Sequence, residues 1–387
     1  MSIPIIAWAR TPVAPVGGTL AHLDAHELAA PLVRRLLRET QLPPEAVDAL
    51  VLGNALGAGG NPARLVALAS GLPEACAAMS VDSQCCAGLD AVSLACGLLA
   101  SGQAEVVIAG GAEAWSRAPI RHHRPMNPNA APQPYEQPAF TPWPDRDPDM
   151  LAAAAAFAQR AGWTRPQQDA YVADSHARAL IAMDWVRQDI EPLAGCSSDT
   201  YPRRLTTERL ARMPAVAGDD PAFALSVAAV APKADGAALI LLATEAACRR
   251  WGLHPTAHWH ASVSLGGAPD TPMRCAAPAV QAVVRRAGWT LASLHDVELH
   301  DAFAVQGLDV VDTLGVPPER VNADGGGLAR GHPIGASGAI ALVMLLARLR
   351  RQTGEHSRRG VACAAAAGGI GAAIAIQSVP RRHTDQE

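Results

Sequence analysis

The sequence contains the octapeptide Gly331-His332-Pro333-Ile334-Gly335-Ala336-Ser337-Gly338, directly before the apolar segment 339–349. No requirement of packing or solubility calls for such a string. The glycines and the proline around the histidine predict a tight loop that presents an imidazole at the start of a helix. This arrangement indicates chemistry, although a histidine that merely caps the helix fits the octapeptide alone equally well.

The size and composition of the chain are typical of a metabolic enzyme. Its 387 residues are 49% hydrophobic and carry a formal net charge of −4, which suits a large core in two related domains. The balanced charge and the lack of a basic stripe argue against a nucleic-acid partner. The apolar runs 1–10 and 151–158 suit neither a signal peptide nor a membrane span, so we expect a cytoplasmic protein without a membrane partner. The eight cysteines favour reduced thiols, and their spacing resembles no metal site.

Predicted strands and helices alternate along the chain. Short apolar runs indicate buried strands at 49–53, 105–109 and 238–242, and longer segments predict helices at 25–39, 88–100 and 279–287. This alternation predicts an α/β fold with a largely parallel sheet.

A weak internal repeat favours two similar halves. The Gly-rich strand end at 108–112 resembles the segment 366–371 near the end of the chain. Between the halves, residues 121–148 are crowded with Pro, Asn, His and Gln and lack periodicity, which predicts an inserted loop region without strand or helix. The last residues, 381–387, are expected to fray.

Two further segments carry candidate chemistry. Cys85 follows the polar turn 82–84 and precedes an apolar helix, where the helix dipole favours a thiolate that can attack a carbonyl. A buried small hydrophobe is the alternative interpretation of this cysteine. His300 and Asp301 follow an apolar strand, where a lone histidine is more often structural.

These segments together resemble the thiolase superfamily, in the same order and over nearly the whole chain. The matching segments are Ala9-Arg10-Thr11-Pro12-Val13, Asn61-Pro62-Ala63-Arg64, the Cys85 segment, Ala109-Gly110-Gly111-Ala112-Glu113 with Ser116-Arg117-Ala118-Pro119, Asp235-Gly236-Ala237-Ala238, His300-Asp301-Ala302-Phe303 and the octapeptide. The resemblance implies an α/β thiolase fold with two similar βαβαβαββ halves in a five-layered αβαβα core and an inserted loop domain. It places the N-terminal half at residues 1–118 and about 215–246, the inserted domain at 119–214 and the C-terminal half at 247–387.

The resemblance also implies roles for individual residues. Cys85 corresponds to the nucleophile that takes up the acyl group, and His332 to the histidine that activates this thiol and, when protonated, stabilises the thiolate. His300 stands where many members have an asparagine, and it would donate a hydrogen bond to an enolate oxygen. Positions of the CoA channel correspond to Ala302, Phe303, Ala231 and Met273.

The resemblance further implies substrates and partners. The family acts on acyl-CoA thioesters and forms dimers or tetramers. We therefore expect an acyl-CoA substrate, no separate cofactor and no metal, and a homodimer or homotetramer that leaves room for further subunits.

The chain departs from the family pattern at several site positions. An alignment without gaps places Ala365 where the family has the cysteine that removes or returns the α-proton, and a methyl group cannot act as a base. Cys363 lies two residues earlier and would face the same side of a strand, about 6.5–7 Å away. Asp82, Ala231 and Ala234 stand where Asn, Ser and Asn are common.

Three functions are open on the sequence alone. Cys85, His300 and His332 resemble the Cys-His-His set of β-ketoacyl synthases, which decarboxylate a malonyl thioester and need no α-proton base. We therefore favour an atypical member that lacks the second catalytic cysteine, a synthetic acyltransferase working through an acyl-Cys85 intermediate. One alternative is an ordinary acetyl-CoA acetyltransferase or 3-ketoacyl-CoA thiolase, in which Cys363 or a water replaces the missing base. The other is a weakly catalytic acyl-CoA-binding subunit of a complex.

Overall fold

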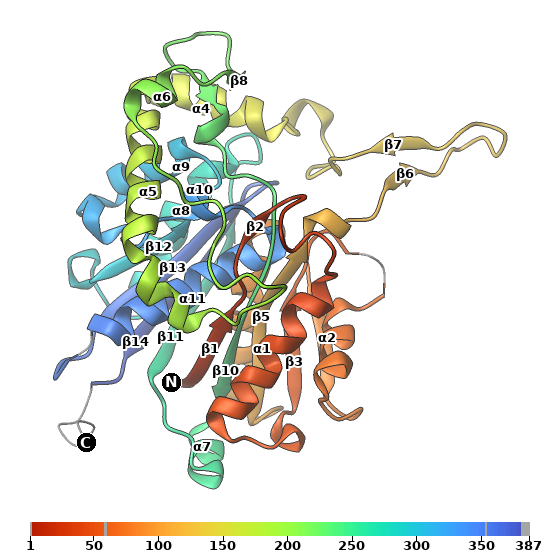
Figure 1. Cartoon of the computed structure of the whole chain (residues 1–387), viewed down its shortest axis with the longest axis vertical. Helices are drawn as coiled ribbons and strands as arrows, with labels where there is room; N and C mark the ends of the chain where they lie inside the picture. Colours follow the sequence, from red (N-terminus) through yellow and green to blue (C-terminus); the bar gives the residue numbers. More distant parts are fainter. Residues whose placement is uncertain (1, 58–59, 353, 381–387) are drawn as a thin grey trace.

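The structure is a computed structural model that describes residues 2–57, 60–352 and 354–380 (Figure 1). The strands are β1 (Ile3–Arg10), β2 (Ala14–Pro15), β3 (Ala49–Gly53), β4 (Ala77–Val81), β5 (Val106–Ala114), β6 (Arg121–His123), β7 (Gln133–Tyr135), β8 (Ala215–Ala217), β9 (Leu225–Ser226), β10 (Ala234–Ala243), β11 (Ala257–Gly266), β12 (Asp296–His300), β13 (Arg359–Ala366) and β14 (Ile370–Ser378). The helices are α1 (Ala25–Thr40), α2 (Pro62–Ser70), α3 (Ala87–Ala100), α4 (Met150–Ala161), α5 (Arg165–Val186), α6 (Thr207–Ala211), α7 (Glu245–Trp251), α8 (Ala276–Arg286), α9 (Ala304–Leu314), α10 (Gly327–Arg330) and α11 (Ile334–Gln352).

Two consecutive halves of the chain build one large sheet. Within the described residues it is a ten-stranded mixed sheet in the order β12-β13-β14-β11-β1-β10-β5-β3-β4, with β2 paired to β10. The first half runs β1-α1-β3-α2-β4-α3-β5 and then, after a long insertion, β10, which is the predicted βαβαβαββ order. The second half follows this order from β11 to β14, but the strand that would correspond to β4 is reduced to a single parallel bridge between Val297 and Val321.

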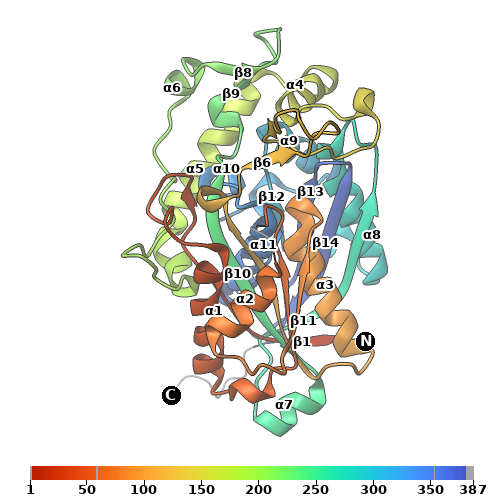
Figure 2. The ribbon, with the colours of Figure 1, turned by 90° about the vertical axis from the view of Figure 1, so that its right-hand side faces the viewer.

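Helices cover the outer face of each half of the sheet. Two further helices fill the space between the two halves. α1 and α2 bury apolar residues on the outer face of the first half, and α8 does so on the outer face of the second half. α3 and α11 pack against each other between the halves (Figure 2). The predicted α/β fold with a five-layered αβαβα core is therefore confirmed.

α11 is the central helix of the molecule. Nearly every residue at 335–349 is buried, as expected of a helix that protein encloses on all sides. Its first turn lies directly on the first half, because a Cβ atom at Gly335 would lie 2.6 Å from the Cα atom of Asn54. A Cβ atom at Gly111 would lie 2.1 Å from the carbonyl oxygen of Gly335. Residues without side chains thus fix the start of α11 against β3 and β5.

The prediction of a largely parallel sheet is wrong. β3 is parallel to β4 and β5, and β12 is parallel to β13, but the pairs from β5 through β10, β1, β11 and β14 to β13 are antiparallel. The reason lies in the connections. The insertion leaves β5 and enters β10 at the same end of the sheet, since Ala114 is paired with Asp235. β13 and β14 are joined by a tight turn, which permits only antiparallel strands.

The Gly-rich segments of the two halves are not structurally equivalent. Gly110 and Gly111 lie inside β5, where the backbones of β10 and α11 approach closely. Gly368 and Gly369 instead form the turn between β13 and β14, with φ angles of 78° and 77°. The similarity of the halves thus lies in the order of their elements and not in this short sequence echo.

The sequence predicted that the segment 121–148 contains no strand or helix, and this prediction is wrong. β6 and β7 pair as a short hairpin that projects away from the body of the molecule (Figure 1). Most of its residues are exposed, so burial imposes no alternation of apolar and polar residues on these strands. The domain boundaries proposed from the resemblance stay a prediction. Residues 381–387, which were expected to fray, lie outside the described part of the chain.

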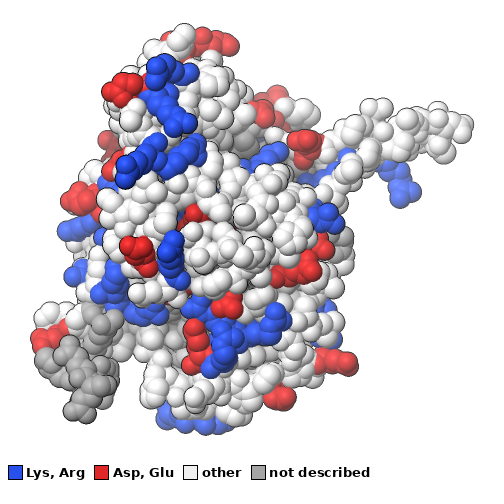
Figure 3. All heavy atoms as spheres, viewed as in Figure 1, with Lys and Arg blue, Asp and Glu red and all other residues white. Residues whose placement is uncertain are grey.

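The surface carries mixed charge. Figure 3 shows Lys and Arg side chains interspersed with Asp and Glu on the face in view, in agreement with the small net charge. Among the described helices, none combines the length and the apolar character that crossing a membrane would require.

Candidate active site

The first three residues of the octapeptide form the loop between α10 and α11, and the other five begin α11. The backbone of His332 is held on two sides. Its N–H group donates to the carbonyl oxygen of Pro232 at 2.7 Å, and its carbonyl oxygen accepts from Nε1 of Trp115 at 3.0 Å. Gly331 has a φ angle of 124°, which a residue with a side chain rarely adopts, and a Cβ atom there would lie 2.7 Å from the side chain of Ala234. The backbone therefore delivers the imidazole in a fixed direction, as the sequence predicted.

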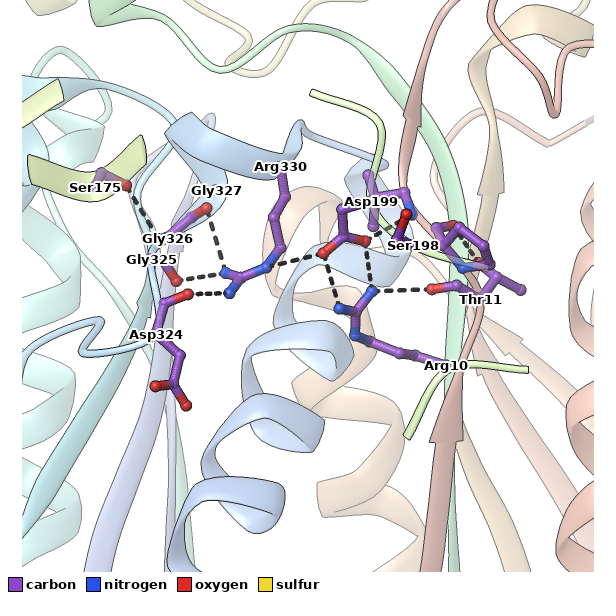
Figure 4. Close-up of polar contacts among 12 residues, drawn as sticks. Arg10, Thr11, Ser175, Ser198, Asp199, Asp324, Gly325, Gly326, Gly327 and Arg330 are labelled. Atoms are coloured by element: carbon purple, nitrogen blue, oxygen red, sulfur yellow. Dashed lines mark hydrogen bonds and ion pairs between the residues drawn. The ribbon is translucent and has the colours of Figure 1, made fainter. Parts of the chain in front are cut away.

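A buried cluster of charges anchors α10, immediately before His332. The carboxylate of Asp199 accepts two hydrogen bonds from Arg10, at 2.7 and 2.8 Å, and lies 3.3 Å from Nε of Arg330 (Figure 4). Although burial opposes it, the guanidinium of Arg10 lowers the pKa of Asp199. Arg330 also donates to the carbonyl oxygens of Asp324 and Gly325. The cluster ties β1, the segment after α5 and α10 together at the base of the histidine loop.

Cys85 lies in a tight turn (Gln84–Cys86) between β4 and α3. Gln84 has a φ angle of 55°, an uncommon conformation for a residue with a side chain. The turn is held because the N–H group of Gln84 donates to the side chain of Asp82 at 2.9 Å and that of Cys86 donates to the carbonyl oxygen of Ser83. Backbone strain of this kind gathers at functional sites, where surrounding contacts enforce it.

The structure brings Cys85 and His332 into contact. Sγ of Cys85 lies 3.2 Å from Nε2 of His332, although 247 positions separate the two residues. On the other side of the ring, Nδ1 of His332 lies 2.7 Å from the hydroxyl of Ser337, which donates its single proton to the carbonyl oxygen of Pro333 at 3.0 Å. The hydroxyl can therefore only accept from Nδ1, so Nδ1 carries the ring proton and Nε2 presents a lone pair to the thiol.

Burial shifts both members of this contact toward their neutral forms. Burial raises the pKa of Cys85 to about 12, outweighing the backbone N–H groups of Cys85 and Ala367, which lower it. Burial also lowers the pKa of His332 to about 4. Both shifts oppose the predictions that the helix dipole favours a thiolate and that a protonated imidazole stabilises it, and these two statements stay predictions. The cost of burying charge exceeds both effects.

His300 lies behind His332 at the end of β12. The two imidazole rings are stacked, with centroids 4.4 Å apart and an angle of 26° between their planes. Burial, and next the neighbouring His332, hold the pKa of His300 well below its usual range. The three residues predicted to carry chemistry therefore form one contiguous group, in which His332 lies between Cys85 and His300.

A cavity of about 640 Å³ opens onto Cys85 and His332. Ala231, Met273, Ala302 and Phe303, which the resemblance assigns to the CoA channel, all line it. Two contacts join these wall segments: the N–H group of Ala231 donates to the carbonyl oxygen of Ala302 at 2.9 Å, and Val230 forms a β-bridge to Phe303. The cavity is large enough for the thioester end of a CoA substrate, because ligand pockets typically measure a few hundred cubic ångströms.

The position that the resemblance assigns to the family's second cysteine also lies in this cavity. Ala365 lines it together with Ala366 and Ala367, and Cys85 is the one thiol among the described lining residues. Cys363 packs on the same side of β13 as Ala365, as the strand spacing predicts, but it is fully buried beside α8 and does not reach the cavity. Burial raises its pKa far above the usual value. A buried thiol with such a pKa would be a poor base for a substrate in the cavity.

Several residues that support the site were not among the predicted ones. Glu113 is buried in β5, and its carboxylate accepts from the side chain of Asn54 and from the N–H groups of Ala55 and Gly335. It thereby ties the start of α11 to the segment after β3, and burial raises its pKa to about 7. The signal for Glu113 was a single carboxylate in the apolar run 106–114. Ser337 and its partner His332 both lie in the octapeptide, but their contact depends on how that segment folds.

Comparisons with known proteins identify the family of the chain. Residues 3–246 match the family model "Thiolase, N-terminal domain" and residues 253–378 match "Thiolase, C-terminal domain". The chain belongs to the thiolase superfamily. It is 32% identical to an acetyl-CoA acetyltransferase of Allochromatium vinosum, over 97% of this chain and 99% of that protein.

Solved thiolase structures have the same fold. A Bacillus anthracis acetyl-CoA acetyltransferase superposes with a TM-score of 0.89 at 28% identity, covering 98% of this chain and 99% of the other. A human mitochondrial 3-ketoacyl-CoA thiolase in complex with CoA superposes with a TM-score of 0.89 at 26% identity, covering 98% of both chains. The chain is thus a thiolase-superfamily acyltransferase, an enzyme.

We expect Cys85 to be a neutral thiol at neutral pH. Burial raises its pKa, so its thiolate should form only in strongly alkaline solution. The measurement is the ultraviolet thiolate absorbance of the wild type minus that of Cys85→Ala, in which the other seven cysteines cancel. A difference that already appears below pH 7 would reveal a thiolate–imidazolium pair and contradict the neutral contact.

Proposed function

We propose that Cys85 accepts the acyl group of an acyl-CoA thioester. The observation that carries the proposal is the 3.2 Å contact between Sγ of Cys85 and the lone pair on Nε2 of His332 at the wall of the cavity. As Sγ bonds to the acyl carbon, the thiol proton passes to Nε2. The bond from the acyl carbon to the CoA sulfur breaks, and Nε2 returns the proton to that sulfur. Covalent catalysis of this kind divides one acyl transfer into two easier steps.

A neutral resting pair suits this reaction. The buried thiol is not ionised in advance, so charge develops only when the thioester is present and the proton has a defined acceptor. The backbone N–H groups of Cys85 and Ala367 lie close enough to the sulfur to lower its pKa. We propose that they also donate to the thioester oxygen as it becomes negative, since preorganised N–H groups stabilise such an oxyanion.

The relatives favour acetyl as the acyl group. The similar proteins of Allochromatium vinosum and Bacillus anthracis are both named acetyl-CoA acetyltransferase. We therefore propose acetyl-CoA acetyltransferase activity as the main function, with acyl transfer between CoA thioesters. This proposal replaces the synthetic, atypical enzyme that the sequence alone favoured as the first choice.

One observation supports a second candidate. Reversible thiolase chemistry needs a base for the α-proton, and the cavity wall has Ala365 at the corresponding position, with Cys363 buried elsewhere. Without such a base, the carbanion must come from the loss of carbon dioxide, or the acyl group must pass to another nucleophile. A synthetic acyltransferase that lacks the second catalytic cysteine therefore stays a proposal beside the main one.

Two expectations from the resemblance remain predictions. We propose that the protein assembles as a homodimer or homotetramer and works in the cytoplasm. The support for both proposals is membership of the thiolase family.

The acyl-cysteine step predicts a defined change in mass. Incubation with acetyl-CoA should add one acetyl group to the wild type and none to Cys85→Ala, as measured by intact-protein mass spectrometry. Malonyl-CoA in a parallel sample would reveal a preference for a decarboxylated acyl group. If neither thioester adds mass to the wild type, the protein is instead an acyl-CoA-binding subunit without this step.

The two candidates differ in the effect of a thiol at position 365. If the missing base limits the reaction, Ala365→Cys should raise the rate of acetoacetyl-CoA thiolysis by about tenfold or more, because a positioned general base typically contributes at least that much. Cys363→Ala is the matched control and should leave the wild-type rate unchanged. A fast wild-type rate that disappears in Cys363→Ala would establish ordinary thiolase chemistry and exclude the second candidate.

A further inference from the structure

Two buried polar side chains on β12 have atoms without a partner. Oε1 of Glu298 and Nε2 of His300 make no hydrogen bond within the described residues. Both side chains are almost fully buried, with 2% and 4% of their surface exposed. Because the side chains of a strand alternate, residues 298 and 300 face the same side, toward α11. An unpaired polar atom in such a place is costly, so each requires an explanation.

A small cavity provides that explanation. Glu298 and His300 line the same cavity of about 20 Å³, together with Arg330, Ser337 and Met344. A space of this size holds one water molecule, which needs about 10–15 Å³ and two to four polar partners. The cavity is too small for a substrate and distinct from the large cavity that opens onto Cys85, since none of these five residues lines the latter.

We propose that this cavity is a binding site for one water molecule, which bridges Glu298 to His300 and makes Glu298 a positioning residue of the active site. The water hydrogen-bonds to the carboxyl group of Glu298 and to a ring nitrogen of His300, and so fixes the orientation of that ring. His300 stacks on His332, which contacts Cys85. Glu298 therefore acts on the acyl transfer through two rings, without touching the substrate. This role rests on the proposed function.

The neutral form of Glu298 serves this role. Burial raises its pKa well above the usual range, more than the neighbouring Arg330 lowers it. Asp324 and Asp296 raise the pKa further, while Arg348 lowers it. Burial likewise keeps His300 neutral. In their neutral forms, which burial favours, a carboxyl group, one water and an imidazole can each donate and accept, so the bridge itself carries no charge. Glutamine should therefore replace Glu298 in this role, whereas methionine should not.

The site can be tested directly in the wild type. A crystal structure at a resolution that shows ordered water should contain one peak within hydrogen-bond distance of both Glu298 and His300. The peak should remain in Glu298→Gln and vanish in Glu298→Met. An empty cavity in the wild type, or a direct hydrogen bond between the two side chains, would overturn the proposal. This readout does not depend on whether Cys85 accepts an acyl group.

Kinetics test the positioning role. The rate of Cys85 acetylation at saturating acetyl-CoA should fall about tenfold or more in Glu298→Met, since small misplacements of catalytic groups are costly, and stay near the wild-type rate in Glu298→Gln. The half-saturating concentration should not change, because Glu298 does not line the substrate cavity. Val297→Ala is the control for general destabilisation, since this buried neighbour on β12 faces away from the site. It should lower the melting temperature and leave the acetylation rate unchanged.

Each kinetic result decides the role of Glu298. An unchanged rate in Glu298→Met, or an equal loss in both Glu298 variants, would exclude a hydrogen-bonded bridge as the positioning element. If the acetylation rate falls as much in Val297→Ala as in Glu298→Met, the loss reflects destabilisation of β12 and not a positioning role of Glu298. If the wild type is not acetylated at all, the proposed function fails, and the water site is then judged from the crystal structures alone.

Discussion

The contact between Cys85 and His332 is the interaction on which the rest of the structure depends. It joins the two halves of the chain, because Cys85 precedes α3 in the first half and His332 precedes α11 in the second. These two helices pack together between the halves, and the glycines at the start of α11 let it lie on the backbone of β3 and β5. The close approach of these backbones is what places an imidazole nitrogen at hydrogen-bond distance from a thiol.

Burial determines the chemistry of the contact. It shifts both groups toward their neutral forms, which favours a site that separates charge only during the reaction. The fixed charges of Arg10, Asp199 and Arg330 lie at the base of the histidine loop, where they anchor α10. Removing one member of such a buried set would leave an uncompensated charge, which is strongly destabilising. The cluster therefore holds the loop without placing a charge against the thiol.

Much of the fold and the central residues of the site could be predicted from the sequence. The apolar runs located β3 and α3, and the octapeptide with the Cys85 segment identified the pair that meets in space. The strand directions and the pKa of Cys85 could not be predicted, because they depend on contacts between distant segments. The tautomer of His332 depends on how the octapeptide folds. Glu113 shows the first limit: it was visible as a residue, but its role is defined by partners that only folding brings together.

The account makes His332 the base that removes the proton from Cys85. The most direct test is the rate at which acetyl-CoA acetylates Cys85 in His332→Gln, with His356→Gln, an exposed histidine, as the control. We predict that the rate falls by about 100-fold or more in His332→Gln, as expected for the loss of a general base, and is unchanged in His356→Gln. A folded His332→Gln protein that acetylates Cys85 as fast as the wild type would contradict the account.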